Sequence, residues 1–234
     1  MCWIADNRQQ TISSTTPQLA HGEYGEYILR TGTDTIRQLE LVYGAHWYRT
    51  RFEGKAPILD LGPGRCWFAK QNVDDIVAVD KAPEVVEHYQ RQGITIKTGD
   101  AYEIPYPDEY FEGVFCCWLL EHLSEPDRAI SELYRILKPG GYACVIVPSP
   151  KNMTTFYDDY THVRPYTPVS LKQLAEGSGF ARYRIECLPW VRGITYLIRF
   201  RGPIAGEKYM RWADAWLRKL RLVSRNGLML EAWR

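Results

Sequence analysis

The sequence predicts a doubly wound α/β fold, and three observations predict it. From Ile58 onward, short runs that are apolar on both faces alternate with stretches of helical character, as a parallel sheet covered by helices requires. The first apolar run ends in a glycine-rich turn. Apolar residues make up 45% and charged residues 24% of the 234 residues, which is typical of one soluble globular domain of ordinary to large size.

The elements of this fold follow from periodicity and from the residues that interrupt it. Apolar runs predict strands over residues 58–61, 76–79, 94–96, 114–120, 142–147, 183–188 and 228–233. Helical patterns cover residues 23–52, 83–91, 125–137, 169–176 and 206–223. Residues 1 to about 20 are polar and without a clear period, and residues 149–168 form a long polar loop of the kind that often carries function.

Four segments follow from this pattern. They are a leader and cap helix over 1–55, an α/β core over 56–189, a basic, tryptophan-containing lid insertion over 190–226, and a final core strand over 227–234. For the helical stretch 23–52 two readings stay open, a cap over the ligand end of the sheet or a layer on the core.

The turn after the first strand is the candidate ligand cradle. Gly62 and Gly64 permit backbone conformations that a Cβ atom disfavours, and they let a ligand approach the main chain. A helix is expected to begin near Arg65, and its unpaired N–H groups would then face the same turn. Strand, glycine turn and helix together predict a cofactor-binding loop.

Acidic residues follow the neighbouring strands, where an open parallel sheet binds its ligand. Asp60 lies in the first strand, Asp80 ends the second, Asp100 follows the third, and Glu121-His122 follows the fourth. A dinucleotide fingerprint would need a glycine at the sixth position of the turn, where this chain has Trp67. The remaining pattern suits ribose hydroxyls at the second strand and an adenine edge at the third.

Several motifs in this order resemble the class I S-adenosylmethionine-dependent methyltransferases, in their small-molecule branch. The motifs are Ile-Leu-Asp60-Leu-Gly62-Pro-Gly64, Val-Ala-Val-Asp80, Gly-Asp100-Ala101, Trp118-Leu-Leu-Glu-His122-Leu and Leu133-Tyr-Arg-Ile-Leu-Lys-Pro-Gly-Gly141. The resemblance spans roughly residues 58–233. It implies a mostly parallel, seven-stranded, Rossmann-like sheet with an antiparallel last strand, and an enzyme.

The resemblance also implies the cofactor, S-adenosylmethionine, with S-adenosylhomocysteine as product. The implied cofactor-binding residues are Asp60, Gly62, Gly64, Asp80, Asp100, Ala101 and Trp118. The chain departs from the family pattern at Cys66, where a third glycine is usual, and we favour normal cofactor affinity despite it. Arg65 is expected at the surface rather than on the methionine carboxylate.

Methyl transfer needs in-line positioning, and removal of a proton when the acceptor is a hydroxyl. His122 and His162 are the candidate bases, because histidine titrates near neutrality. The later loop, where the family meets its substrate, supplies Asp159, Tyr160, Arg164 and Tyr166 as candidate acceptor contacts. No metal is expected; a cation held by oxygen ligands of this loop is the less favoured alternative.

The predicted function is methylation of a small molecule, most often at a hydroxyl, with a carbohydrate, lipid-linked or secondary-metabolite acceptor. The net charge of +1 gives no argument for nucleic acid, although residues 190–225 carry nine basic and two acidic side chains. An RNA or protein methyltransferase that docks through this segment, and a catalytically silent S-adenosylmethionine-binding module, are the alternatives.

The sequence also bears on location and assembly. It shows no charged-then-apolar leader and no run of about eighteen apolar residues, so we expect a cytoplasmic protein. The six cysteines form no C-x-x-C pair and are expected to be buried small hydrophobes. A homodimer stays open.

Overall fold

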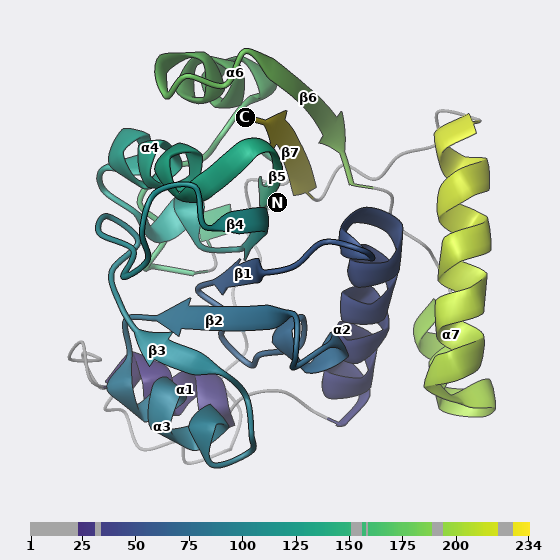
Figure 1. The fold of residues 1–234 in the computed structure, drawn as a ribbon. Helices are drawn as coiled ribbons and strands as arrows, with labels where there is room; N and C mark the ends of the chain where they lie inside the picture. The colour runs from purple at the N-terminus through teal and green to yellow at the C-terminus, as the bar shows by residue number, and fades with distance from the viewer. Residues whose placement is uncertain (1–22, 31–33, 151–155, 158, 189–193, 220–226) are drawn as a thin grey trace, which may run out of the picture.

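The computed structural model describes residues 23–30, 34–150, 156–157, 159–188, 194–219 and 227–234. They form one seven-stranded sheet in the order β3-β2-β1-β4-β5-β7-β6 (Figure 1). The strands are β1 (Ile58–Leu61), β2 (Ile76–Asp80), β3 (Ile96–Thr98), β4 (Phe111–Cys117), β5 (Leu137–Pro148), β6 (Arg182–Cys187) and β7 (Gly227–Trp233). β1 to β5 pair in parallel, and β7 is antiparallel to both β5 and β6. The predicted fold class is confirmed.

Helices connect the strands as the alternating pattern predicted. They are α1 (Glu23–Arg30), α2 (Asp34–Trp47), α3 (Pro83–Gln90), α4 (Pro126–Ile136), α6 (Pro168–Gly177) and α7 (Ile194–Lys219). A five-residue π-helix, η1 (Tyr48–Phe52), continues α2, and two short 3₁₀ turns, η2 (Ala69–Gln71) and η3 (Leu120–His122), follow β1 and β4. The predicted leader and both ends of the predicted lid, residues 1–22, 190–193 and 220–226, lie outside the described residues.

Three local expectations are corrected. No α-helix begins near Arg65, because the chain makes a series of turns there before η2. The fourth strand ends at Cys117 rather than at residue 120, because Trp118 takes a left-handed conformation with φ 57°. The last long helix begins at Ile194 rather than near residue 206, and it bends at Gly202, whose φ of 79° is not helical.

Two hydrophobic layers fill the two faces of the sheet. One packs α4 and α6 side chains such as Leu133 and Leu171 against β4, β5 and β7. The other contains Phe68 and Phe115, whose rings stack with centroids 4.2 Å apart, together with side chains of α3. Burial on both faces explains why the parallel strands have no polar face.

The N-terminal helices divide between the two roles that the sequence left open. α1 lies beside α3 near β3, where a Cβ atom on Gly64 would come within 3.9 Å of Ile28 Cγ2 (Figure 1). α2 instead packs against α7, with Val42 buried against Met210 and Ala213. Ile28 of α1 thus lies close to the glycine turn, whereas α2 packs against α7.

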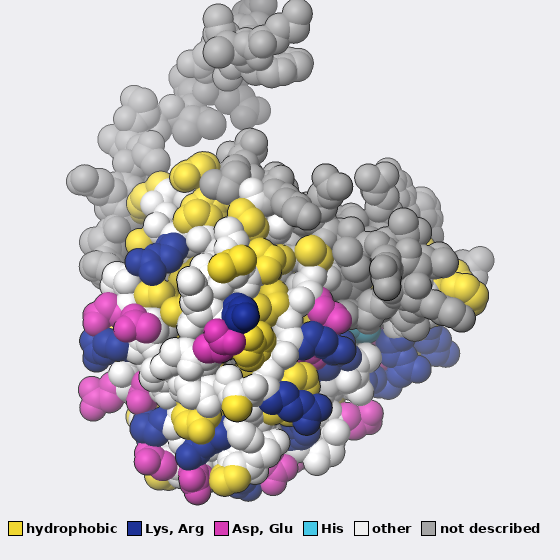
Figure 2. Space-filling view, turned by 90° about the horizontal axis from the view of Figure 1, so that it is seen from above, with side chains coloured by type: hydrophobic (Ala, Val, Ile, Leu, Met, Phe, Trp, Pro, Cys, Tyr) yellow, Lys and Arg dark blue, Asp and Glu magenta, His cyan; other side chains and the backbone are white. Residues whose placement is uncertain are grey.

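The exposed surface does not concentrate one sign of charge on the face shown in Figure 2. Lysine and arginine side chains alternate there with aspartate and glutamate. None of the described helices combines the length and the apolar composition needed to cross a membrane.

Candidate functional site

The glycine turn follows β1 and takes the conformation expected of a cofactor cradle. Gly62 and Gly64 have φ of 65° and 51°, in the left-handed region that glycine favours. The Gly62 amide donates to the Val79 carbonyl at 2.9 Å, which binds the turn to β2. A Cβ atom on Gly62 would lie 2.9 Å from Leu119 Cδ2, so the glycine also admits the segment that follows β4.

Cys66 completes the same turn in a glycine-like conformation. Its φ is 52°, its side chain is fully buried, and its amide donates to the Pro63 carbonyl at 2.8 Å. A left-handed residue with a Cβ atom costs about 1–2 kcal/mol. Burial raises the pKa of the Cys66 thiol, so it is an inert, packed side chain. The turn therefore forms with cysteine in place of the family's third glycine.

Asp60 and Asp80 hold the turn from two sides. Asp60 is buried and accepts a hydrogen bond from the Ala69 amide at 3.1 Å, and burial raises its pKa to about 8. Asp80 accepts from the Ala82 amide at 2.9 Å, and burial raises its pKa against the effect of the Gly64 amide. Asp60 therefore supports the turn from its buried side, whereas Asp80 is half-buried and lies on its more exposed side.

Asp100 and Ala101 lie beside them at the end of β3. Asp100 accepts from the Tyr102 amide through Oδ1 and from Lys81 Nζ through Oδ2, both at 3.0 Å. Although partial burial opposes its charge, these two donors lower the pKa of Asp100. Ala101 is almost buried, so its backbone rather than its side chain faces any ligand.

The residues present fit S-adenosylmethionine. A Cβ atom placed on Gly64 would meet Ile28 Cγ2 of α1 at 3.9 Å, so the glycine leaves space that a side chain would fill. The parallel register places Asp80 level with Thr98, so the ends of β1, β2 and β3 meet at one edge. Asp80 offers an acceptor for ribose hydroxyls, and Asp100 offers one for an adenine amino group.

Arg65 and Trp118 border this edge. The Arg65 guanidinium forms an ion pair with Glu40 and so joins the glycine turn to α2. This pairing agrees with the expectation that Arg65 does not bind the methionine carboxylate. Trp118 is 42% exposed, and a Cβ atom placed on Gly227 would lie 3.1 Å from its ring. The strained φ of Trp118 directs the chain into η3, which carries the next group of polar residues.

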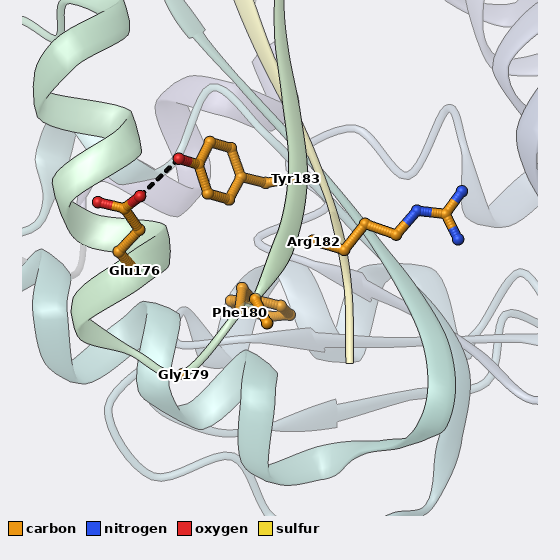
Figure 3. Close-up of a pocket in the computed structure, with 6 residues that line it drawn as sticks. Glu176, Gly179, Phe180, Arg182 and Tyr183 are labelled. Carbon is orange, nitrogen blue, oxygen red and sulfur yellow. Dashed lines mark hydrogen bonds between the residues drawn. The ribbon is translucent and has the colours of Figure 1, made fainter.

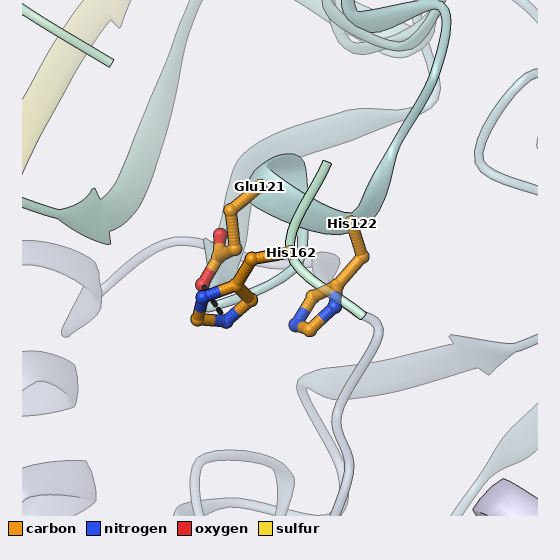
Figure 4. Close-up of side chains that lie close together, drawn as sticks. All are labelled: Glu121, His122 and His162. Carbon is orange, nitrogen blue, oxygen red and sulfur yellow. Dashed lines mark ion pairs between the residues drawn. The ribbon is translucent and has the colours of Figure 1, made fainter. Parts of the chain in front are cut away.

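His122 and His162 come together in the structure, although forty residues separate them in the sequence. Their ring centroids are 4.7 Å apart. His162 Nδ1 donates to the Phe156 carbonyl at 2.7 Å, because a carbonyl only accepts. His162 Nε2 lies 4.0 Å from Glu121 Oε1 and 3.8 Å from Asp159 Oδ2, and Figure 4 shows the Glu121, His122 and His162 side chains sharing one space.

Thr161 connects His122 to a carboxylate. The Thr161 hydroxyl donates to Asp159 Oδ1 at 2.6 Å, so the 3.0 Å contact between His122 Nδ1 and Thr161 Oγ1 uses a proton on the histidine. The lone pair of neutral His122 is therefore on Nε2. Burial, then the charge of His162, lower the pKa of His122, which keeps its ring neutral near pH 7.

Glu121 is the third member of the cluster and is buried, at 1% exposure. Burial raises the pKa of Glu121 to about 8. Its main-chain carbonyl accepts from the amides of Val163 and Arg164 at 2.8 and 3.3 Å. These two bonds join η3 to the loop that carries His162.

Of the residues predicted to contact the acceptor, two are exposed and one is buried. Tyr160 is 74% exposed and Arg164 is exposed, so both are free to meet an acceptor. Tyr166 is placed differently from the expectation, because it is buried and its hydroxyl donates to the Leu120 carbonyl at 3.1 Å, where it supports η3. Thr161 was missed altogether, because no local pattern shows which side chain a distant histidine contacts.

A hollow at the corner between α6 and β6 is not this site. Its rim includes Glu176 and Tyr183, joined by a 2.6 Å hydrogen bond, and Arg182, which points away from them (Figure 3). Through β7, Arg182 is level with Tyr142, whereas the end of β4 is level with Ile146. The hollow thus lies at the opposite end of the strands from η3 and the histidines.

Comparison with known proteins agrees with this geometry. Residues 59–145 match the family model of a methyltransferase domain. A 2-methyl-6-phytyl-1,4-hydroquinone methyltransferase of Oryza sativa subsp. japonica is 28% identical over 129 residues, which cover 52% of this chain and 39% of that protein. The chain spans less than half the length of the curated relatives it matches.

Solved structures share the fold. A S-adenosylmethionine-dependent methyltransferase from Archaeoglobus fulgidus has a TM-score of 0.65 at 24% identity, over 91% of this chain and 98% of that one. A phosphoethanolamine N-methyltransferase of Haemonchus contortus, in complex with S-adenosylmethionine, has a TM-score of 0.59 at 16% identity, over 90% and 60%. Residues 59–145 therefore form a methyltransferase domain, and the fold around them is that of the class I S-adenosylmethionine-dependent methyltransferases.

Proposed function

We propose that this protein transfers a methyl group from S-adenosylmethionine to a small-molecule acceptor, at a hydroxyl oxygen. The observation that carries the proposal is the position of His122 and His162. Their ring centroids are 4.7 Å apart; His122 lies in η3, which follows β4, and His162 lies in the loop after β5. Leu119, just before η3, packs against Gly62 of the glycine turn. The proposal takes this histidine pair as the proton acceptor for a hydroxyl that meets the methyl donor.

The chain's own residues supply positioning and proton removal. When bound, S-adenosylmethionine supplies an electrophilic methyl group. The glycine turn, Asp80 and Asp100 hold the cofactor, while Tyr160 and Arg164 are free to orient the acceptor. His122 accepts the hydroxyl proton at Nε2 as the oxygen–methyl bond forms and the methyl–sulfur bond breaks, and His162 is the alternative acceptor. The products are a methyl ether and S-adenosylhomocysteine.

The outer surface of α7 favours one class of acceptor. Trp212 and Trp216 are 60% and 48% exposed, with ring centroids 6.3 Å apart, and Lys208 and Arg211 are exposed beside them. Aromatic and basic side chains on one helix suit an acceptor with an apolar or sugar portion and a negative charge. A carbohydrate or lipid-linked hydroxyl compound fits this surface.

A second candidate is C-methylation of a hydroquinone ring, and the name of the Oryza sativa relative favours it. The ring carbon next to a hydroxyl becomes nucleophilic once the hydroxyl proton is removed, so the same histidines would serve. Nuclear magnetic resonance of the product distinguishes a methoxy group from a ring methyl group.

The test combines labelled methyl donor with site variants. Wild-type protein is incubated with S-adenosylmethionine labelled in the methyl group and with hydroquinones, glycolipids and a fractionated cell extract. We expect label in a small molecule, about 10²-fold to 10⁴-fold lower kcat in His122→Ala and His162→Ala, and unchanged cofactor affinity. His88→Ala, a histidine of α3, is the matched control. Normal turnover in both site variants would remove the histidines from the mechanism.

A further inference from the structure

Glu121, His122 and His162 form a cluster that has the composition of a metal centre. One ligand atom from each lies within 4.8 Å of the others, and the side chains come from η3 and from the loop joined to it (Figure 4). We propose that these three side chains bind a divalent first-row transition metal ion, with Asp159 as an additional ligand. This site lies outside the residues that hold the methyl donor.

The histidines are already oriented as metal ligands. A ligating histidine usually donates its second ring N–H to a carbonyl or a carboxylate, which leaves the other nitrogen's lone pair for the metal. His162 does this through Nδ1 to the Phe156 carbonyl, and His122 does it through Thr161 to Asp159. Both rings therefore carry their lone pair on Nε2.

The buried carboxyl group of Glu121 supports the metal site independently of the two histidines. It is 1% exposed, and neither carboxyl oxygen accepts a hydrogen bond of normal geometry from another described residue. Burying a carboxyl group without partners is costly, so such a group needs an explanation. Oxygen Oε1 instead lies 4.0 Å from His162 Nε2, close enough for one ion to contact both atoms.

The spacing requires only small side-chain movements. Ligand atoms about 2.1 Å from a tetrahedral ion lie about 3.4 Å from one another. His162 Nε2 is 4.0 Å from Glu121 Oε1 and 3.8 Å from Asp159 Oδ2. Closing these two gaps takes about half an ångström each. The His122 nitrogen lies within 4.8 Å of the other ligand atoms, so it moves inward by up to about 1.4 Å to complete a centre of two nitrogens and one or two oxygens.

The nitrogen and oxygen ligands of this cluster determine which metal ion it prefers. Two imidazoles with a carboxylate suit Zn²⁺, Fe²⁺ or Mn²⁺, whereas Mg²⁺ and Ca²⁺ prefer oxygen ligands alone. The expectation of no metal, drawn from the sequence, is therefore one that this proposal revises. That expectation concerned oxygen ligands of the loop alone, whereas this centre combines Glu121 with two histidines.

The role of the ion rests on the proposed function. A metal ion that binds the acceptor hydroxyl lowers the pKa of that hydroxyl. The proton then leaves to solvent, and the metal-bound oxygen takes the methyl group as the methyl–sulfur bond breaks. In this form His122 and His162 hold the ion instead of accepting the proton themselves.

Metal binding is measured without any acceptor. Full-length protein is treated with chelator, dialysed, and titrated by calorimetry with ZnCl₂, MnCl₂ and MgCl₂. We expect one Zn²⁺ or Mn²⁺ per chain and much weaker Mg²⁺ binding. Glu121→Gln and His162→Gln should each weaken Zn²⁺ binding about 100-fold, whereas His88→Gln should bind as wild type does. Visible absorption of the Co²⁺ form reports the same site and should be lost in both site variants.

Cofactor binding by the same variants keeps the test decisive. Both site variants should bind S-adenosylmethionine as wild type does, which shows that they are folded. Absence of stoichiometric Zn²⁺ and Mn²⁺ binding by wild type, or wild-type affinity in both variants, would overturn the metal site. Full methyl transfer by chelated protein would overturn the role of the ion but leave the proposed function standing. Metal binding without S-adenosylmethionine binding would do the reverse.

Discussion

The two halves of the site are built differently. The cofactor half uses backbone at the ends of β1, β2 and β3, where Gly62, Gly64 and Asp80 follow strands directly. The acceptor half joins η3 to a loop forty residues later, and two amides on the Glu121 carbonyl hold them together. A cofactor shared by many proteins can be bound by a local motif, whereas an acceptor site depends on long-range contacts.

The sharpest way to break the cofactor half is Gly62→Ala. The new Cβ atom meets Leu119 at 2.9 Å, at a φ of 65° that alanine disfavours. Strain of about 2–3 kcal/mol corresponds to about 30-fold to 150-fold weaker S-adenosylmethionine binding, measured by calorimetry. Gly93→Ala is the matched control, since its φ is +80° but no atom lies within 4 Å. Equal cofactor affinity in the two variants would contradict this account of the turn.

Asp60 tests the same half through pH. Its pKa is about 8 in the folded chain, above its ordinary value of 3.8, so the unfolded chain loses this proton first as pH rises. Its contribution to the free energy of unfolding is thus complete below pH 4 and is lost by pH 8. Asp60→Asn should flatten this decline by about 2 kcal/mol or more in denaturant titrations at pH 4, 6 and 8.

Exposed Asp74 provides the control for that pH series. Asp74→Asn should leave the wild-type slope of unfolding free energy against pH unchanged. A slope that stays the same in Asp60→Asn as well would mean that Asp60 is ionised in the folded protein.

Thr161 tests the acceptor half. Thr161→Val keeps the side-chain shape but removes the hydroxyl that holds His122 Nδ1 at 3.0 Å and joins it to Asp159. We expect about 10-fold lower kcat with little change in cofactor affinity, because the ring loses its orientation. Thr161→Ser should restore kcat. If the valine variant keeps full kcat, Thr161 does not position His122.

Cys66 should have the smallest effect. Cys66→Gly relieves the cost of a φ of 52° but removes a buried side chain, and these effects offset each other. We expect S-adenosylmethionine affinity to change by less than about 3-fold, because the turn is already formed with cysteine. A 10-fold gain in affinity in the calorimetric titration would show that Cys66 weakens the cofactor site.

Sequence patterns predicted the sheet and the glycine turn after β1 well, for a physical reason. Buried parallel strands are apolar throughout, and glycines and acids at their ends are local signals. The left-handed Trp118, which ends β4 early, has no such signal, because tertiary packing imposes it. The expected helix near Arg65 is absent, since the turn there is closed by hydrogen bonds that the pattern does not reveal.

The acceptor half was only partly predictable. The sequence predicts His122 and His162 as candidate bases, because histidine titrates near neutrality. Their contact with each other, and the lack of hydrogen bonds to the Glu121 carboxyl oxygens from described residues, depend on how η3 packs against a distant loop. Tyr166 has the composition of a ligand contact, yet its hydroxyl is used by the Leu120 carbonyl. Residue type alone does not show which hydrogen bonds a side chain has already made.

The division of labour between the two halves is tested most directly by one calorimetric series. S-adenosylmethionine is titrated into wild type, Asp80→Asn and the double variant His122→Asn/His162→Asn, with Asp74→Asn as the control. The account predicts binding by wild type and the control, about 10-fold or greater weakening in Asp80→Asn, and wild-type affinity in the double histidine variant. Absence of binding by wild type, or weakening in the histidine variant alone, would contradict it.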